Sequence, residues 1–145
     1  MKKLLAVMLV LVIALAAVGC SGRAEISRDD IVDKTYVYEG DGFGGDFTIE
    51  IKADGTFDYY EGFFSSHIGL GEWTYADGTL TLLEEVSRFV GTNEAGKNEM
   101  EQVVYSYVFS VRENTLIFVA EDSDNFRYLT VSDGEKFIAR RSDEK

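Results

Sequence analysis

Apolar and polar residues alternate along most of the chain after Thr35, and this alternation predicts β-strands. Phe47, Ile49 and Ile51, for example, each have polar neighbours, which is the pattern of a strand with one buried face. After a first strand that begins at Thr35, the pattern predicts strands near 46–53, 56–61, 71–76, 79–84, 102–111, 115–120, 126–131 and 136–140.

Short turn motifs separate these segments. Asp-Gly between alternating runs is the strongest short-range hairpin signal, so we predict a hairpin tip at each of three pairs. These pairs are Asp54-Gly55, Asp77-Gly78 and Asp133-Gly134. Residues 87–101 form a long polar connection, which we predict to be a mobile loop. Ser27 and Asp30 have the spacing of a capping box and predict one short helical turn.

Eight or nine short antiparallel strands with no crossover helices predict an all-β fold, a small up-and-down meander. We favour a closed or nearly closed barrel over a sandwich because a barrel has no edge strands, and the chain has no proline to protect edges. The interior of an eight-stranded barrel is either filled by side chains or holds one small ligand. Aromatic residues on the alternating strands suit both alternatives, and we expect Trp73 to lie in the core.

The N-terminus has the features of a targeting signal. After Lys2 and Lys3, residues 4–18 form an unbroken apolar run of 15 residues. A bilayer-spanning helix needs about 20 residues, whereas this length is typical of a signal-peptide core. The run ends at Ala17-Val18-Gly19-Cys20, which contains the only cysteine of the chain.

These last residues resemble the lipobox of bacterial lipoproteins, in which the signal is removed before a cysteine that becomes lipidated. The resemblance implies a signal peptide over 1–19 and a lipidated Cys20. Together with the capping box and the strand pattern, it divides the rest of the chain into a short tether with a possible helical turn over 20–34 and a single barrel domain over 35–145. An ordinary secretory signal that is cut elsewhere, or an uncleaved anchor, remains the alternative. In the lipoprotein interpretation the membrane is a partner through the covalent lipid, and the mature domain is extracytoplasmic in the cell envelope.

Charge limits the classes of partner. The 145 residues include 14 basic and 26 acidic side chains and a single histidine. Removal of residues 1–19 takes away two lysines and no acid, which leaves 12 basic against 26 acidic side chains and a net charge of −14. Such a domain is repelled by anionic headgroups and by phosphate backbones, so we expect no nucleic-acid partner. One cysteine and one histidine also exclude an internal disulfide framework and a classical zinc site.

The hairpin motifs carry a second resemblance. The pattern Asp54-Gly55-Thr56-Phe57, then Gly71-Glu72-Trp73, then Asp77-Gly78-Thr79-Leu80 resembles small bacterial lipoproteins with a lipocalin-like (calycin-type) β-barrel. The resemblance extends over residues 35–138. No activity or catalytic residues are established for that family, so the resemblance supports only the fold and the cellular localisation.

An uncharged segment over 62–71 stands out in this acidic chain. Its large side chains are Phe63, Phe64, His67, Ile68 and Leu70. Apolar side chains in such a segment either fold over one end of the barrel as a lid or form a binding surface, because exposed apolar patches usually mark sites. We take these five residues as the candidate binding site.

Other motifs are weaker. Residues 40–45 match G-x-G-x-x-G, but a strand is predicted after them, whereas dinucleotide binding requires a helix there. Asp122, Asp124 and Asn125 lack the rest of a calcium loop and are interpreted as a solvated turn. His67 follows two serines, yet the chain has no G-x-S-x-G elbow.

The sequence therefore predicts a protein without catalytic residues, metal or cofactor. We expect a non-catalytic binding module for a small apolar ligand or an envelope protein. An inhibitor or accessory protein of an envelope enzyme is the alternative, and a small hydrolase is a third.

Overall fold

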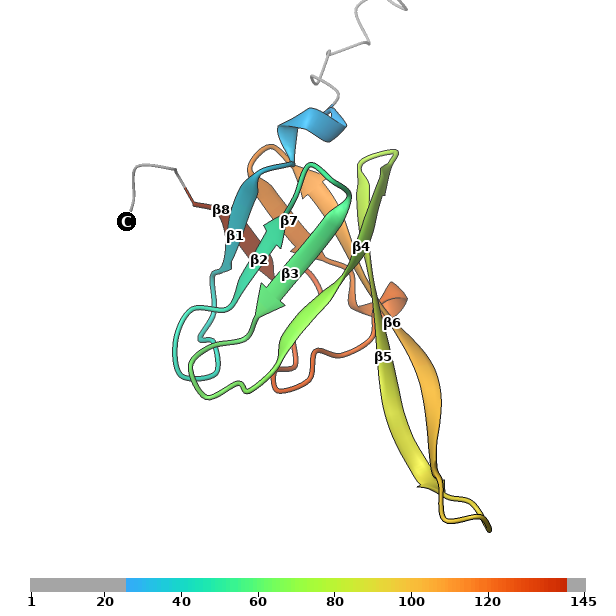
Figure 1. The fold of residues 1–145 in the computed structure, drawn as a ribbon. Coiled ribbons are helices and arrows are strands. Elements are labelled where there is room, and N and C mark those ends of the chain that lie inside the picture. The colour runs from blue at the N-terminus through green and yellow to red at the C-terminus, as the bar shows by residue number, and fades with distance from the viewer. Residues whose placement is uncertain (1–25, 141–145) are drawn as a thin grey trace, which may run out of the picture.

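The computed structural model describes residues 26–140. Eight antiparallel strands follow one another in chain order and close into a barrel, as Figure 1 shows. They are β1 (Lys34–Tyr38), β2 (Thr48–Ile51), β3 (Thr56–Tyr60), β4 (Ile68–Ala76), β5 (Thr79–Thr92), β6 (Asn98–Arg112), β7 (Thr115–Phe118) and β8 (Lys136–Ala139). The predicted all-β, up-and-down, closed barrel is confirmed. Cys20 and the predicted signal peptide lie outside the described residues.

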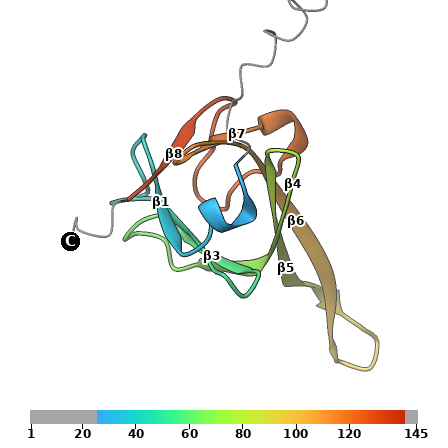
Figure 2. The same ribbon diagram turned by 90° about the horizontal axis from the view of Figure 1, so that it is seen from above.

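A 3₁₀ turn, η1 (Arg28–Asp30), covers one end of the barrel and is seen over its centre in Figure 2. The predicted capping contact is present, because the backbone N–H of Ser27 donates to Asp30 Oδ2 over 2.8 Å. The next residue, Ile31, is fully buried and so seals this end. Neither η1 nor the second 3₁₀ turn, η2 (Ala120–Asp122), is long enough to cross a membrane, and residues 26–140 contain no helix that is.

Because the strands alternate in direction, their connections fall at two ends. The tight turns at Asp54-Gly55 and Asp77-Gly78 lie at the η1 end, and both are hairpin tips, as predicted. Gly55 and Gly78 have φ values of 91° and 76°, which favour glycine. The connections 39–47, 61–67 and 119–135 lie at the opposite end, which we call the loop end.

The predicted strand over 126–131 is wrong. This segment is irregular, so Asp133-Gly134 forms a turn before β8 and is no hairpin tip. The backbone N–H groups of Tyr128 and Leu129 donate to the Glu61 carboxylate instead of to a neighbouring strand. The segment instead inserts the side chain of Phe126 into the barrel.

Phe126 fills the barrel interior near the loop end. Its ring stacks on Tyr107 with centroids 4.2 Å apart and meets the edges of Phe47 and Tyr59 at 4.8 and 5.2 Å. Because the space between these strands is occupied by aromatic rings, the structure favours a filled core over a ligand cavity. Trp73 is buried in the same core, as predicted, and its indole N–H donates to the carbonyl of Lys52 over 2.9 Å.

The predicted mobile loop over 87–101 is also wrong. β5 and β6 continue past the barrel as a two-stranded ribbon, and only residues 93–97 form its turn. The ribbon, which we call the arm, projects beyond the loop end in Figure 1. β5 pairs with β4 up to Glu84 and with β6 alone from Glu85 onward.

Candidate functional site

Three connections meet at the loop end through main-chain hydrogen bonds. The N–H of Phe43 donates to the carbonyl of Glu61 over 2.6 Å, and the N–H of Phe64 donates to the carbonyl of Phe43 over 3.0 Å. The third connection joins through the N–H groups of Tyr128 and Leu129, which donate to the Glu61 carboxylate. These bonds make the loop end a single connected surface.

Aromatic side chains lie on this surface. Phe63 and Phe64 are 80% and 74% exposed, and Phe43 and Tyr128 are about half as exposed. The Phe43 ring stacks on Tyr128 with centroids 5.5 Å apart and meets Phe64 edge-on at 5.9 Å. We call these four residues the aromatic rim.

The glycine-rich loop supports the rim. A Cβ atom on Gly44 would lie 2.2 Å from the Phe64 ring, and one on Gly45 would lie 2.7 Å from the Phe63 ring. The absence of side chains at both positions therefore lets the phenyl rings rest against the backbone. The motif over 40–45 is followed by β2, and in this fold Gly44 and Gly45 serve ring packing.

The structure separates the five predicted site residues. Phe63 and Phe64 are together on the rim. Ile68 and Leu70 are exposed on the outer face of β4, because the predicted uncharged loop becomes strand at Ile68. His67 lies immediately before β4 with its side chain mostly buried. The segment is thus neither a simple lid nor one continuous patch.

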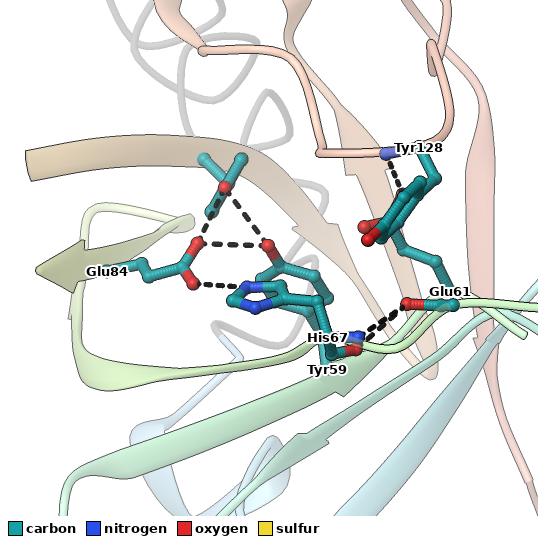
Figure 3. Close-up of polar contacts among 7 residues, drawn as sticks. Tyr59, Glu61, His67, Glu84 and Tyr128 are labelled. Carbon is teal, nitrogen blue, oxygen red and sulfur yellow. Dashed lines mark hydrogen bonds and ion pairs between the residues drawn. The ribbon is translucent and has the colours of Figure 1, made fainter. Parts of the chain in front are cut away.

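Beneath the rim lies a buried polar cluster, shown in Figure 3. Glu84, on β5, is 3% exposed, and its Oε1 atom lies 2.8 Å from Nε2 of His67. The hydroxyls of Tyr59 and Tyr107 each donate to Glu84 Oε2 over 2.9 Å. One carboxyl group therefore joins β3, β5, β6 and the beginning of β4.

The two tyrosines are suited to a donor role. Burial is the main cause that raises the pKa of Tyr59 and that of Tyr107 far above the ordinary value of 10. Both phenols therefore keep their protons at any physiological pH. Together with the imidazole they satisfy the Glu84 carboxyl group, which a buried position requires.

Glu61 is a second buried acid at this end. It has no exposed surface, and its Oε2 atom accepts from the N–H groups of Tyr128 at 2.8 Å and Leu129 at 2.9 Å. Its Oε1 atom has no hydrogen-bond partner among residues 26–140. By holding two consecutive N–H groups, Glu61 fixes the irregular segment that carries Phe126 and Tyr128.

The serines next to His67 are directed elsewhere. Ser65 Oγ donates to the carbonyl of His67 over 2.9 Å, and Ser66 Oγ lies 3.2 Å from the Tyr128 hydroxyl. Within the described part of the chain, neither serine is bonded to the imidazole, as a nucleophile activated by histidine would be. The arrangement serves to hold the loop to the barrel.

The acidic turn over 121–125 has a structural role as well. Asp124 donates its N–H to the carbonyl of Ser106, and its Oδ2 atom accepts from the N–H of Ser106, each over 2.8 Å. These bonds occupy the edge of β6. Across residues 26–140, no group of three or more histidine, cysteine, aspartate or glutamate side chains is placed to hold a metal ion.

Comparison with known proteins adds no relative: no family model, no curated protein and no solved structure matches this chain.

Sequence reasoning missed Glu61, Glu84 and Tyr128. For the two acids a signal was present, because strand residues two apart share a face. Glu61 continues the inward series of Phe57 and Tyr59, and Glu84 continues that of Leu80 and Leu82. An acid at an inward position of a predicted strand is the expected mark of a buried polar cluster. Tyr128 had no comparable signal, since the alternation over 126–131 is that of a strand.

Proposed function

We propose that this protein is a lipid-anchored extracytoplasmic binding module that captures an envelope protein through the aromatic rim, without catalysing a reaction. The observation that carries the proposal is the exposure of Phe63 and Phe64, at 80% and 74%, beside two further aromatic residues. Aromatic side chains are enriched in the buried centres of protein–protein interfaces, and apolar clusters in water usually mark such sites.

A protein partner is favoured over a small ligand. Phe126 and its neighbouring rings occupy the interior of the barrel, so a small apolar molecule that entered the barrel would have to displace core side chains. The rim, in contrast, faces solvent and is already held in place by glycine contacts and main-chain bonds. Pre-organised aromatic groups bind with little loss of conformational entropy.

The rim also lies at a suitable end of the domain. The chain enters the barrel at Ile26 beside η1, and the loop end is opposite. A lipid on Cys20 would therefore hold the η1 end toward the membrane and direct the rim away from it. The net charge of −14 would keep the domain in solvent. The partner is then a protein exposed on the same extracytoplasmic side of that membrane as the domain.

The test is a variant that combines Phe63→Ser with Phe64→Ser. We expect it to lose capture of the partner, measured by pull-down of the lipidated protein from its native membrane. Its melting temperature should remain nearly unchanged because both rings are in solvent. The matched control is Leu70→Ser, which removes an exposed apolar side chain outside the rim. A large fall in melting temperature for the double variant, or equal capture by all three proteins, would contradict the proposal.

A further inference from the structure

The arm exposes an apolar face that the barrel does not use. Phe89, Met100 and Val104 are each between 54% and 58% exposed, and Leu83 at the root of the arm is 40% exposed. Phe89 lies directly opposite Met100 across the two strands, and Val104 lies opposite Glu85. Residues opposite each other and residues two apart share a face, so all of these side chains project from one side of the ribbon. We call it the outer arm face.

Barrel closure does not explain the arm. The β5–β6 pairs that belong to the barrel end near Glu84 and Tyr105, where β4 leaves β5. Beyond that point no third strand from residues 26–140 pairs with the ribbon, and two-stranded ribbons are at best marginally stable in water. A surface that covered the exposed apolar side chains of this ribbon would therefore stabilise it.

The face is a better docking surface than the edges. The register shifts between Phe89 and Gly91, and such bulges twist an edge away from regular strand pairing. On the side opposite the outer arm face, Arg88 and Glu101 form an ion pair of 2.7 Å. Among the described residues, the outer arm face has no such ion pair. Its centre holds the uncharged contact of Gln102 Nε2 with Ser87 Oγ at 2.7 Å.

The acidic side chains near the outer arm face indicate the charge that a partner should have. Glu85 is the only charged side chain on the outer arm face between Leu83 and Phe89, and Glu72 of β4 lies directly opposite Leu83. Both are acids and both are exposed. A second copy of this chain would bring the same acids together on a domain of charge −14, which opposes self-association. Anionic lipid and nucleic acid are repelled for the same reason.

We propose that the outer arm face is a second binding surface, which takes a partner protein presenting an apolar patch bordered by lysine or arginine. Phe89, Met100 and Val104 would enter the apolar patch, and Glu72 and Glu85 would pair with the basic border. The surface is separate from the aromatic rim and does not depend on what the rim binds.

The test uses a photo-crosslinking amino acid in the full-length protein in its own host cells. One protein carries the probe in place of Met100 on the outer face, and the matched control carries it in place of Val103 on the opposite face. We expect the Met100 position to give at least about tenfold more adduct with a protein that is basic at its contact surface. Adding Glu72→Lys and Glu85→Lys should lower that yield by about tenfold, since every 1.4 kcal/mol changes binding tenfold.

Several results would overturn the inference. Equal yields from both faces, no adduct, an adduct with lipid or with a second copy of this chain, or a yield that survives the charge reversal would each do so. The Met100 adduct should persist when Phe63→Ser and Phe64→Ser are present. If it disappears there, the arm is part of the rim site and no separate surface exists.

Discussion

The strongest quantitative test of the filled barrel is Phe126→Ala. The ring of Phe126 is 4% exposed and lies within 5.2 Å, centroid to centroid, of the rings of Phe47, Tyr59 and Tyr107. Returning a buried phenylalanine to water costs about 1.5–3 kcal/mol, and the cavity left among rigid neighbours adds to that cost. We therefore expect a loss of about 3–5 kcal/mol in the free energy of unfolding.

The assay is urea unfolding followed by the fluorescence of Trp73, the only tryptophan of the chain. The matched control is Phe64→Ala, which removes the same ring from a position that is 74% exposed and should change the free energy by no more than about 0.5 kcal/mol. An apolar cavity of this kind stays dry and binds benzene, so benzene should restore part of the stability lost in Phe126→Ala. A loss below about 1 kcal/mol would show that Phe126 does not fill the barrel, and the interior would again be a candidate ligand site.

Two further predictions concern the anchor and the buried phenols. Cys20→Ser should release the protein from the membrane fraction or leave it with an uncleaved signal, and a processed variant that still partitions into detergent would contradict lipidation. Burial raises the pKa of Tyr36 from 10 to about 12. Between these values the unfolded chain loses a proton that the folded protein keeps, so stability is complete below pH 10 and falls as the pH rises. In urea unfolding measured between pH 10 and 12, Tyr36→Phe should make this fall in stability smaller by about 1.4 kcal/mol per pH unit, and an unchanged slope would refute the assignment.

The hairpins of the barrel could be predicted from sequence because their determinants are local. In β2 and β3, apolar residues occupy every second position on either side of Asp54-Gly55, and the structure pairs Ile49 with Tyr59 accordingly. A shift of one residue would move every apolar side chain to the solvent face, so the pattern determines the register. The same reasoning holds for β4 and the barrel part of β5.

The segment over 126–131 could not be assigned in this way. Phe126, Leu129 and Val131 with their polar neighbours look like a strand, but strand formation needs a neighbouring main chain. Here the available N–H groups of Tyr128 and Leu129 are taken by Glu61, about 67 residues earlier in the chain. A carboxylate that replaces a strand partner is a long-range feature with no local signature.

The prediction of a mobile loop over 87–101 was wrong for a related reason. The polar residues of the arm were interpreted as a loop, but they pair across the ribbon, as Arg88 does with Glu101 and Ser87 with Gln102. Cross-strand pairs of this kind stabilise a ribbon without producing an apolar alternation. Phe89 and Met100 were the available signal, because two large apolar residues in a polar segment are unusual for a mobile loop.

The two buried acids explain how an exposed aromatic rim can be held in a defined shape. Glu61 positions Phe43 through its carbonyl and Tyr128 through its carboxylate, so one residue sets both members of the stacked pair. Glu84 holds His67 at the end of the segment that carries the other two rim residues. Hydrogen bonds to charged groups contribute about 1.5–3 kcal/mol each, which offsets part of the cost of burying these two acids.

The acids therefore act as supports for what lies above them. A barrel that needed only a core would not require this polar cluster, since apolar residues would fill the same volume at a lower free-energy cost. The cluster is reasonable in a protein whose loops must present four aromatic side chains in fixed positions. The buried Glu61 and Glu84 and the exposed Phe63 and Phe64 belong to one arrangement at the loop end, and this arrangement supports the proposed recognition there.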